Sequence, residues 1–154
     1  MEPTLFSATR SIVERMYPEA SPIFFPEQYK GEFNLAGRHT EVRVDVQKHI
    51  VVIYSNVPGF TITGKDPTKR LVRFMARVNE MLYFGNLEYN FETGEVRYKT
   101  SQIFQGIANP ENSIRFLLEQ HKENFPKLAE GLDELLRNTQ ADPVTIANAK
   151  FPPT

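Results

Sequence analysis

The three histidines are the first side chains to consider for acid–base or metal chemistry. His39 and His49 lie in or beside predicted turns, and His121 lies on the apolar stripe of a predicted helix. Glu119 and Glu123 stand on other faces of that helix, so they do not form a helical metal pair with His121. We therefore expect no metal site, and we interpret His121 as a core histidine that makes a local hydrogen bond.

Nucleophile and phosphate sites are also poorly supported. The spacing Gly59-x4-Gly64-Lys65 matches the start of a phosphate-binding loop by length. Asp66 then replaces the Ser or Thr that would hold Mg²⁺, and Pro67 removes an amide that the phosphate cradle would use. The chain contains no Gly-x-Ser-x-Gly elbow and 0 Cys, which excludes thiol nucleophiles, cysteine-ligated zinc and disulfides. The sequence therefore predicts no catalytic constellation and no cofactor.

The composition is typical of one globular domain. The 154 residues are 40% hydrophobic, so the chain can bury a core without metal or disulfide support. Lys and Arg total 18 against 19 Asp and Glu, and the net charge of −1 lacks the basic footprint of a general nucleic-acid binder. The N-terminus shows no secretory signal, and the longest apolar run, Ile50–Tyr54, is too short to span a bilayer. We expect a cytoplasmic protein with no membrane or nucleic-acid partner.

Three helices are predicted from apolar periodicity and capping residues. Thr4 caps the first helix, and Gly85 ends the second in the left-handed conformation common after helices. The third carries an apolar stripe that continues past Pro126. Because a proline inside a helix clashes with the preceding turn, we expect a break or kink near Asn124–Phe125. The predicted ranges are Leu5–Met16, Asp66–Phe84, and a C-terminal helix that Asn109 caps and that reaches Leu135.

The strand signals form a meander followed by a hairpin. Alternation predicts strands over Tyr29–Leu35, Glu41–Gln47 and Ile50–Val57, the last covered on both faces and ended by Pro58-Gly59. The stretch Glu19–Glu27 contains two prolines, and we interpret it as an irregular connector held by buried aromatics.

The hairpin lies within Leu87–Thr100 and has two candidate turns. A two-residue Thr93-Gly94 loop would pair Tyr89 with Tyr98, and a bulged four-residue loop is the alternative. The two-residue loop would keep aromatic residues on one face and would pair Glu88 with Lys99 on the other.

The order of these elements predicts the fold class. Helix, three strands, helix, two strands and helix imply an α+β fold in which helices cover one face of an antiparallel sheet. We assign residues 1–137 to a single domain and residues 138–154 to a Pro-containing C-terminal tail that is loose or strapped across the surface.

Two surface features are candidates for binding a protein partner. Basic residues recur every four positions opposite the apolar arc of the second helix, at Lys69, Arg73 and Arg77. This row is either a solvated helix face or a docking stripe for an acidic segment. Phe116 faces away from the stripe of the last helix, so it packs under the C-terminal tail or contacts a partner. These four residues are the candidate partner-binding residues.

Two functional hypotheses follow from the residues. The first is a non-enzymatic protein-binding module that captures a segment of a partner, because the sheet has free edges and no catalytic constellation is present. The second is a small-ligand-binding protein or enzyme with a cryptic pocket between the sheet and the last helix, using His121 or Asp45.

One segment also resembles a known family. The residues that carry the resemblance are Arg70–Leu82, Gly85–Asn90 and Thr93–Tyr98. Their pattern is a helix that ends in an Asn-containing turn, a Gly, a short strand, a Gly-bearing turn and a strand with an aromatic residue. This pattern is similar to that of the YbjN family. The preceding Val44–Val46 and Ile50–Tyr54 also look like the strands that lead into that helix.

The resemblance implies a fold similar to type III secretion chaperones. Those chaperones are small homodimers that hold an extended, unfolded segment of a client protein against apolar surface. YbjN-like proteins are described as candidate regulators of stress or sensory responses, without an established enzymatic activity. The resemblance therefore implies a chaperone-like or regulatory module that is a homodimer.

Overall fold

A computed structural model describes residues 4–25 and 28–153 of the chain. Four helices and six strands are present in the described part. In chain order they are α1 (Leu5–Met16), β1 (Ser21–Phe25), β2 (Gln28–Leu35), β3 (Arg38–Asp45), β4 (Ile50–Thr61), α2 (Lys65–Met81), β5 (Asn86–Tyr89), β6 (Glu95–Ile103), α3 (Glu111–Arg137) and α4 (Pro143–Lys150).

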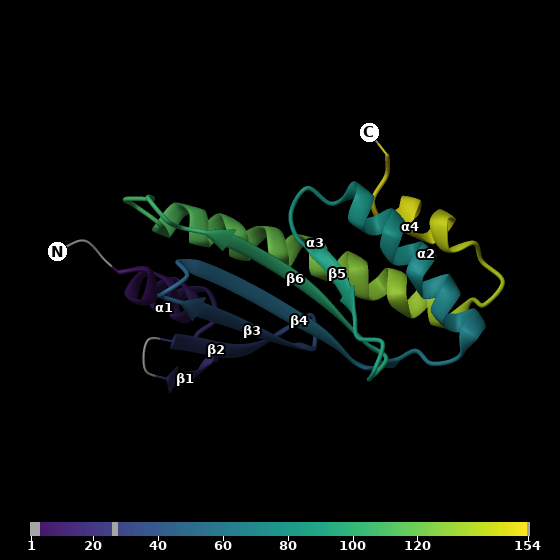
Figure 1. Cartoon of the computed structure of the whole chain (residues 1–154), viewed down its shortest axis with the longest axis horizontal. Helices are drawn as coiled ribbons and strands as arrows, with labels where there is room; N and C mark the ends of the chain where they lie inside the picture. Colours follow the sequence, from purple (N-terminus) through teal and green to yellow (C-terminus); the bar gives the residue numbers. More distant parts are fainter. Residues whose placement is uncertain (1–3, 26–27, 154) are drawn as a thin grey trace.

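The six strands form one antiparallel sheet in the order β1-β2-β3-β4-β6-β5. Helix α1 packs on β2 and β3, and the long helix α3 packs on β4 and β6 (Figure 1). Helices α2 and α4 pack on each other at one end of the sheet, where α2 also contacts β5. No helix of the described chain covers the opposite face, which we call the open face. The predicted α+β arrangement, with helices on one face of an antiparallel sheet, is confirmed.

Alternating side chains in β3 and β4 explain why only one face is covered. Val42, Val44 and Ile53 are at most 1% exposed and belong to the hydrophobic core. Arg43 and Tyr54, which are neighbours of these residues in sequence, line grooves on the open face. The predicted covering of β4 on both faces is therefore wrong, because every second residue of β4 points away from the helices.

Strand β1 occupies part of the segment predicted to be an irregular connector. It pairs with β2 from Ser21↔Glu32 to Phe25↔Gln28. Pro22 is compatible with this position because β1 is an edge strand, and one side of an edge strand needs no backbone donor. Pro26 and Glu27 lie outside the described residues, as do the side chains of Ile23, Phe24 and Phe25 that were predicted to be buried.

Strand β4 also continues further than predicted. Pro58-Gly59 does not end it, since the strand runs to Thr61. The pairing of β4 with β6 shifts register between Asn56 and Thr61. This irregularity accommodates a proline that regular pairing would exclude.

The hairpin of β5 and β6 turns through the four residues 91–94. Asn90 N–H donates to Glu95 O at 2.9 Å, and the Asn90 side-chain oxygen accepts from two N–H groups inside the loop at 2.9 and 3.2 Å. Leu87, rather than Tyr89, pairs with Tyr98. The four-residue alternative is therefore confirmed, because the Asn90 side chain stabilises a turn wider than two residues.

The predicted helices form, with three corrections. The N-cap of α3 is Pro110, with no side-chain cap bond, so the predicted cap at Asn109 is wrong. Thr4 caps α1 by accepting a hydrogen bond from Ser7 N–H at 3.1 Å, as expected. Helix α2 ends at Met81, before the predicted Phe84. Helix α3 is one continuous helix through Pro126, so of the two predicted alternatives, a break or a kink, the break is wrong. Buried residues on both sides of the proline, such as Phe125, hold the helix against the sheet and offset the missing hydrogen bond.

The segment set apart as a C-terminal tail contains helix α4. Asp142 caps this helix by accepting a hydrogen bond from Thr145 N–H at 3.0 Å, and Pro143 occupies its first position. Ile146 and Ala147 are buried, and the helix packs on α2 and α3. The observed order thus adds β1 and α4 to the predicted one.

Gly85 determines where β5 begins. It has a φ of 77°, and a Cβ atom at this position would lie 2.5 Å from the Lys99 carbonyl oxygen and 2.6 Å from Thr100 Cγ2. A side chain is excluded by both the backbone conformation and the close approach to β6. The chain therefore passes close to β6 at Gly85 and pairs with it only from Asn86 onward.

Gly85→Ala is expected to destabilise the fold more than Gly106→Ala. Both glycines have a φ of 77°, but a Cβ at Gly106 meets nothing within 4 Å. Gly106→Ala should cost about 1–2 kcal/mol from the left-handed backbone alone, and Gly85→Ala should cost at least about 1 kcal/mol more because its Cβ meets backbone. Urea unfolding of the two variants measures the difference, and equal losses would contradict the steric role of Gly85.

Candidate protein-binding surface

The basic row predicted on α2 lies beside the chain's own helix α4. Arg77 Nε donates to Asn148 Oδ1 of α4 at 2.8 Å, and its guanidinium also pairs with an acidic residue one turn along α2. Arg73 approaches Asp142 at 3.9 Å, an exposed pair that contributes little stability. Lys69 is exposed. The nearest polar partners of Arg73 and Arg77 thus include side chains of the C-terminal segment.

Arg70, next to this row, has the largest set of contacts with the C-terminal segment. Its guanidinium donates to the carbonyl oxygens of Ala141 at 2.7 Å, Asn138 at 3.0 Å and Leu135 at 3.4 Å. The last carbonyls of a helix have no partner within the helix, so a cationic donor there is favourable. Arg70 therefore ties α2 to the end of α3 and to the connection that leads into α4.

Phe116 lies on a different part of the molecule, beside a cavity of about 350 Å³. Its ring meets the ring of Phe84 edge to face, with centroids 5.3 Å apart, and each of the two residues is 43% exposed. We call this cavity the Phe116 pocket. Its lining residues are Phe84 before β5, Ser101 and Gln102 of β6, and Asn112, Ser113, Phe116 and Leu117 of α3.

The structure does not bring the basic row and Phe116 together. Phe74, next to Arg73 on α2, lies against Gly131 of α3, where an added Cβ would be 2.8 Å from the Phe74 ring. Phe116 lies fifteen residues earlier on α3, which corresponds to about 22 Å along the helix. The four candidate residues therefore belong to two separate surfaces.

Sequence reasoning missed the residues that complete the Phe116 pocket. Phe84 was assigned to the second helix, and Ser101 and Gln102 carry no motif. The available signal was the pair Tyr83-Phe84, two aromatic residues placed directly before a glycine at the end of an amphipathic helix.

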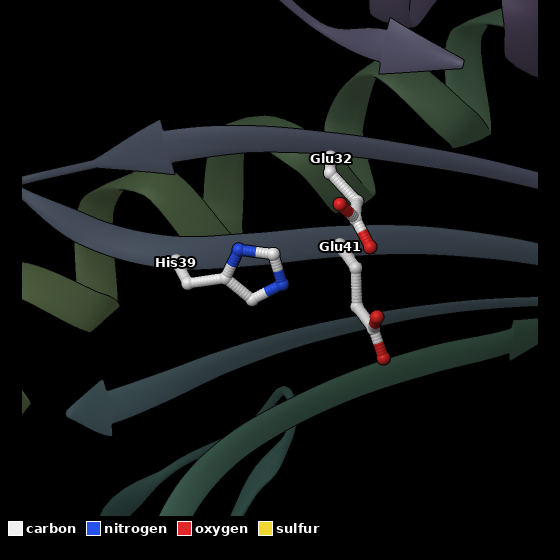
Figure 2. Close-up of side chains that lie close together, drawn as sticks. All are labelled: Glu32, His39 and Glu41. Carbon is white, nitrogen blue, oxygen red and sulfur yellow. The ribbon is translucent and has the colours of Figure 1, made fainter. Parts of the chain in front are cut away.

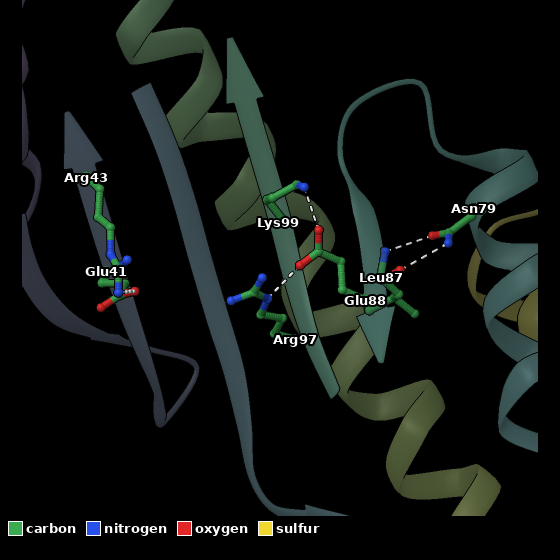
Figure 3. A network of polar contacts seen from close by, with 7 residues as sticks. All are labelled: Glu41, Arg43, Asn79, Leu87, Glu88, Arg97 and Lys99. Carbon is green, nitrogen blue, oxygen red and sulfur yellow. Dashed lines mark hydrogen bonds and ion pairs between the residues drawn. The ribbon is translucent and has the colours of Figure 1, made fainter. Parts of the chain in front are cut away.

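The outer edge of β5 is closed by a side chain of α2. Asn79 Oδ1 accepts from Leu87 N–H at 2.8 Å, and Asn79 Nδ2 donates to the Leu87 carbonyl oxygen at 3.2 Å (Figure 3). The amide of Asn79 thus occupies the place that a neighbouring strand would take. The predicted free sheet edge is blocked at this residue.

The open face carries two ion-pair networks. Glu88 bonds Arg97 at 2.6 Å and Lys99 at 2.5 Å, and these hydrogen bonds hold the pKa of Glu88 below its usual value although burial opposes that shift (Figure 3). A groove of about 970 Å³ lies on this face, and the Arg97 guanidinium stands 4.3 Å above the Tyr54 ring within it. Because these charges are matched inside the chain, this face presents neutralised ion pairs rather than one sign of charge.

One cluster on the open face has the donor types of a metal site. Glu32 and Glu41 face each other across β2 and β3, and ligand atoms of these residues and His39 lie within 4.8 Å of one another (Figure 2). Lys30 Nζ already lies 2.7 Å from Glu32 and 2.9 Å from Glu41, and its hydrogen bond holds the pKa of Glu32 below normal. Arg43 also pairs with Glu41 at 2.7 Å. Protein cations therefore neutralise both carboxylates.

His121 lies in the core, and both of its ring nitrogens are hydrogen-bonded. Ser55 Oγ lies 2.7 Å from Nε2, Thr100 Oγ1 lies 2.9 Å from Nδ1, and Thr40 Oγ1 lies 2.6 Å from Ser55 Oγ. The side chain is 1% exposed, and burial lowers the pKa of His121 to about 3. The interpretation of His121 as a core histidine with local hydrogen bonds is confirmed. Asp45 lies on the open face, so it does not meet His121.

Comparison with solved structures finds chains of similar fold. A chain of the ExsC–ExsE complex superposes with a TM-score of 0.52 and 13% sequence identity, over 84% of this chain and 97% of that chain. The fold is that of a type III secretion chaperone. No model of a known protein family matches the sequence, and no curated protein matches it. None of the helices in the described ranges is long and apolar enough to cross a bilayer.

His121 is expected to make the protein less stable in acid. Its pKa is about 3 in the folded chain against 6.5 when unperturbed, so the unfolded chain binds the proton first as the pH falls. Stability from this group is unaffected above pH 6.5 and declines between pH 6.5 and about 3, by up to about 1.4 kcal/mol per pH unit. Urea unfolding across this range should show a shallower pH dependence for His121→Gln than for the unmodified chain.

The matched control is the exposed His49, whose φ is 52°. His49→Asn suits that backbone conformation and should keep the pH dependence of the unmodified chain. An unchanged slope in His121→Gln would show that this imidazole is not the group responsible.

Arg70→Met is expected to loosen the C-terminal segment. Loss of a charged donor to three carbonyl groups should lower the free energy of unfolding by about 2–3 kcal/mol. Lys69→Met, at the exposed neighbouring position, should stay within about 0.5 kcal/mol. Urea unfolding compares the two variants, and similar losses would mean that Arg70 does not hold this segment.

Proposed function

We propose that this chain is a non-enzymatic protein-binding module, chaperone-like or regulatory, that captures a segment of a partner protein at the Phe116 pocket. The pocket itself is the observation that carries the proposal. Two aromatic rings, each 43% exposed, frame a cavity of about 350 Å³ beside a strand of the sheet. The likeness in fold to a chain of the ExsC–ExsE complex supports a protein-binding role.

The chemistry of the pocket favours a polypeptide ligand. Its seven lining residues are aromatic, aliphatic or neutral polar, and none carries a formal charge. A volume of about 350 Å³ is near the lower end of the roughly 300–1,000 Å³ typical of small-molecule sites. Such a pocket suits one or two apolar side chains of a larger ligand, flanked by hydroxyl and amide groups that bond to main chain.

The enzymatic alternative has no comparable support. Ser55 and His121 are arranged like a nucleophile and its base, at 2.7 Å, but both are fully enclosed by the core. The second imidazole nitrogen bonds Thr100 rather than a carboxylate. This geometry stabilises the core, and burial keeps both side chains out of reach of a substrate.

The proposal includes three further elements from the sequence. The segment that resembles the YbjN family forms α2, β5 and β6, so the family assignment is proposed on a contiguous structural unit. Assembly as a homodimer in the cytoplasm is proposed with it, and light scattering tests the assembly. Lys69, Arg73 and Arg77 are proposed as a second contact, for an acidic partner segment.

A photo-crosslinking residue at position 116 is expected to trap a protein partner. Phe116 should be replaced by p-benzoylphenylalanine, with Phe91 as the matched control because it is an aromatic residue that is 77% exposed in the turn between β5 and β6. After expression and irradiation in native cells, we expect one defined adduct from position 116 and none from position 91. Adducts of equal yield at both positions, or none at either, would reject the proposed surface.

The same experiment tests the basic row. Lys69→Glu with Arg73→Glu should weaken the adduct while changing the free energy of unfolding by about 0.5 kcal/mol or less. An unchanged adduct removes the basic row from the partner-binding surface and leaves the Phe116 pocket.

A further inference from the structure

Strand β6 is longer than the strand that pairs with its outer side. Strand β5 covers only Val96–Lys99 of β6, from Tyr89↔Val96 to Asn86↔Lys99, whereas β6 continues to Ile103. Beyond Lys99 the outer side of β6 is therefore a sheet edge of its own. The chain leaves β6 at Gly85, where a Cβ atom would lie 2.5 Å from the Lys99 carbonyl oxygen and 2.6 Å from Thr100 Cγ2.

The hydrogen-bond pattern shows which backbone groups this edge presents. Leu87 gives its N–H and C=O to Asn79, outside the sheet, so Leu87↔Tyr98 is a non-hydrogen-bonded pair. Lys99 must then direct its own N–H and C=O toward β5. By the same alternation Ser101 and Ile103 direct theirs toward the uncovered side. Phe104 N–H donates in the other direction, to His49 O at 2.6 Å, as this alternation requires.

These backbone groups have no partner in the described chain. Within residues 4–25 and 28–153, no hydrogen bond joins the N–H or C=O of Ser101 or Ile103 to another residue on this side. Ser101 also lines the Phe116 pocket, so space lies directly beside the edge. The edge thus offers two donors and two acceptors next to an apolar cavity.

We infer that an extended segment of a partner protein pairs with β6 at Ser101–Ile103 as an added strand and places apolar side chains in the Phe116 pocket. This inference rests on the proposed function and specifies its ligand. Side chains of an added strand alternate between faces, so every second residue would meet Phe84, Phe116 and Leu117 on the helix-covered side.

The lining of the pocket limits the partner's sequence. No charged residue lines it, so the side chains that enter are expected to be apolar and uncharged at positions i and i+2. The residues between them face the open side, next to Ser101 and the exposed Ile103. A helical ligand would instead present apolar residues at i, i+3 and i+4 and would leave the β6 backbone groups unpaired.

Selection from a displayed library of random twelve-residue peptides tests this inference. The immobilised full chain is the target, and the selected sequences are expected to show apolar residues at alternate positions. The highest-affinity selected peptide then serves as the probe for titrations. In hydrogen exchange, the amides of Ser101 and Ile103 should exchange rapidly in the free chain and slowly in the complex.

Variants at one position separate the backbone contribution from the side chain. Ser101→Pro removes the outward N–H without removing a hydrogen bond to β4, and edge strands accept proline there. It should weaken the probe at least about tenfold, whereas Ser101→Ala should keep affinity within about twofold. Phe116→Asp should also weaken the probe at least about tenfold. Circular dichroism and urea unfolding check that each variant is folded.

Other outcomes would contradict strand pairing, and some of them would also contradict the proposed function. The probe could lose affinity for Phe116→Asp but bind Ser101→Pro normally, or its apolar residues could follow helical spacing. Either result would reject strand pairing and would leave the proposed function standing. A probe insensitive to both positions, or a selection without binders, counts against the proposed function as well. The unmodified chain could be a dimer that Ser101→Pro converts to a monomer. That result would show that a second copy of this chain pairs with the edge, and it would reject pairing with a partner segment.

Discussion

The packing of α3 on the sheet is the contact on which the rest of the structure depends. Its buried stripe covers β4 and β6, its ends meet α1 and α4, and it continues unbroken through Pro126. This one helix therefore unites both ends of the molecule in a single core. Because it occupies only one face of the sheet, the other face must remain compatible with water, and the matched pairs around Glu88 and Glu41 satisfy that requirement.

His121 fixes the position of α3 above the sheet centre. Apolar packing alone tolerates sliding of a helix, whereas hydrogen bonds between His121 and both Ser55 on β4 and Thr100 on β6 require one alignment. The imidazole is stable there because it is neutral and both nitrogens are paired. The same environment that makes this side chain a good alignment device removes it from acid–base chemistry at neutral pH.

The two sides of β5 show how a short strand shapes a surface. Asn79 closes the outer side of β5 at Leu87, and Gly85 prevents β5 from extending along β6. The first contact protects a sheet edge, and the second leaves another edge beside exposed aromatic rings. The uncovered edge of β6 is therefore produced by where the chain's own strand pairing stops.

The sequence alone was sufficient for the features that depend on local periodicity. The alternation around Val42 and Val44, the amphipathic arc of α2, the cap at Thr4 and the helix-covered sheet all follow from side-chain spacing within one segment. Phe116 could be chosen as a candidate binding residue because it lies outside the apolar stripe of its own helix. Strand β1 was missed because local rules penalise Pro22, and only the edge position of β1 makes that proline acceptable. The tertiary structure alone decided which backbone groups are paired, since Asn79 with Leu87 and Ser55 with His121 are contacts between separate elements. The tertiary structure also decided the uncovered edge at Ser101, because an edge exists only where the neighbouring strand does not reach.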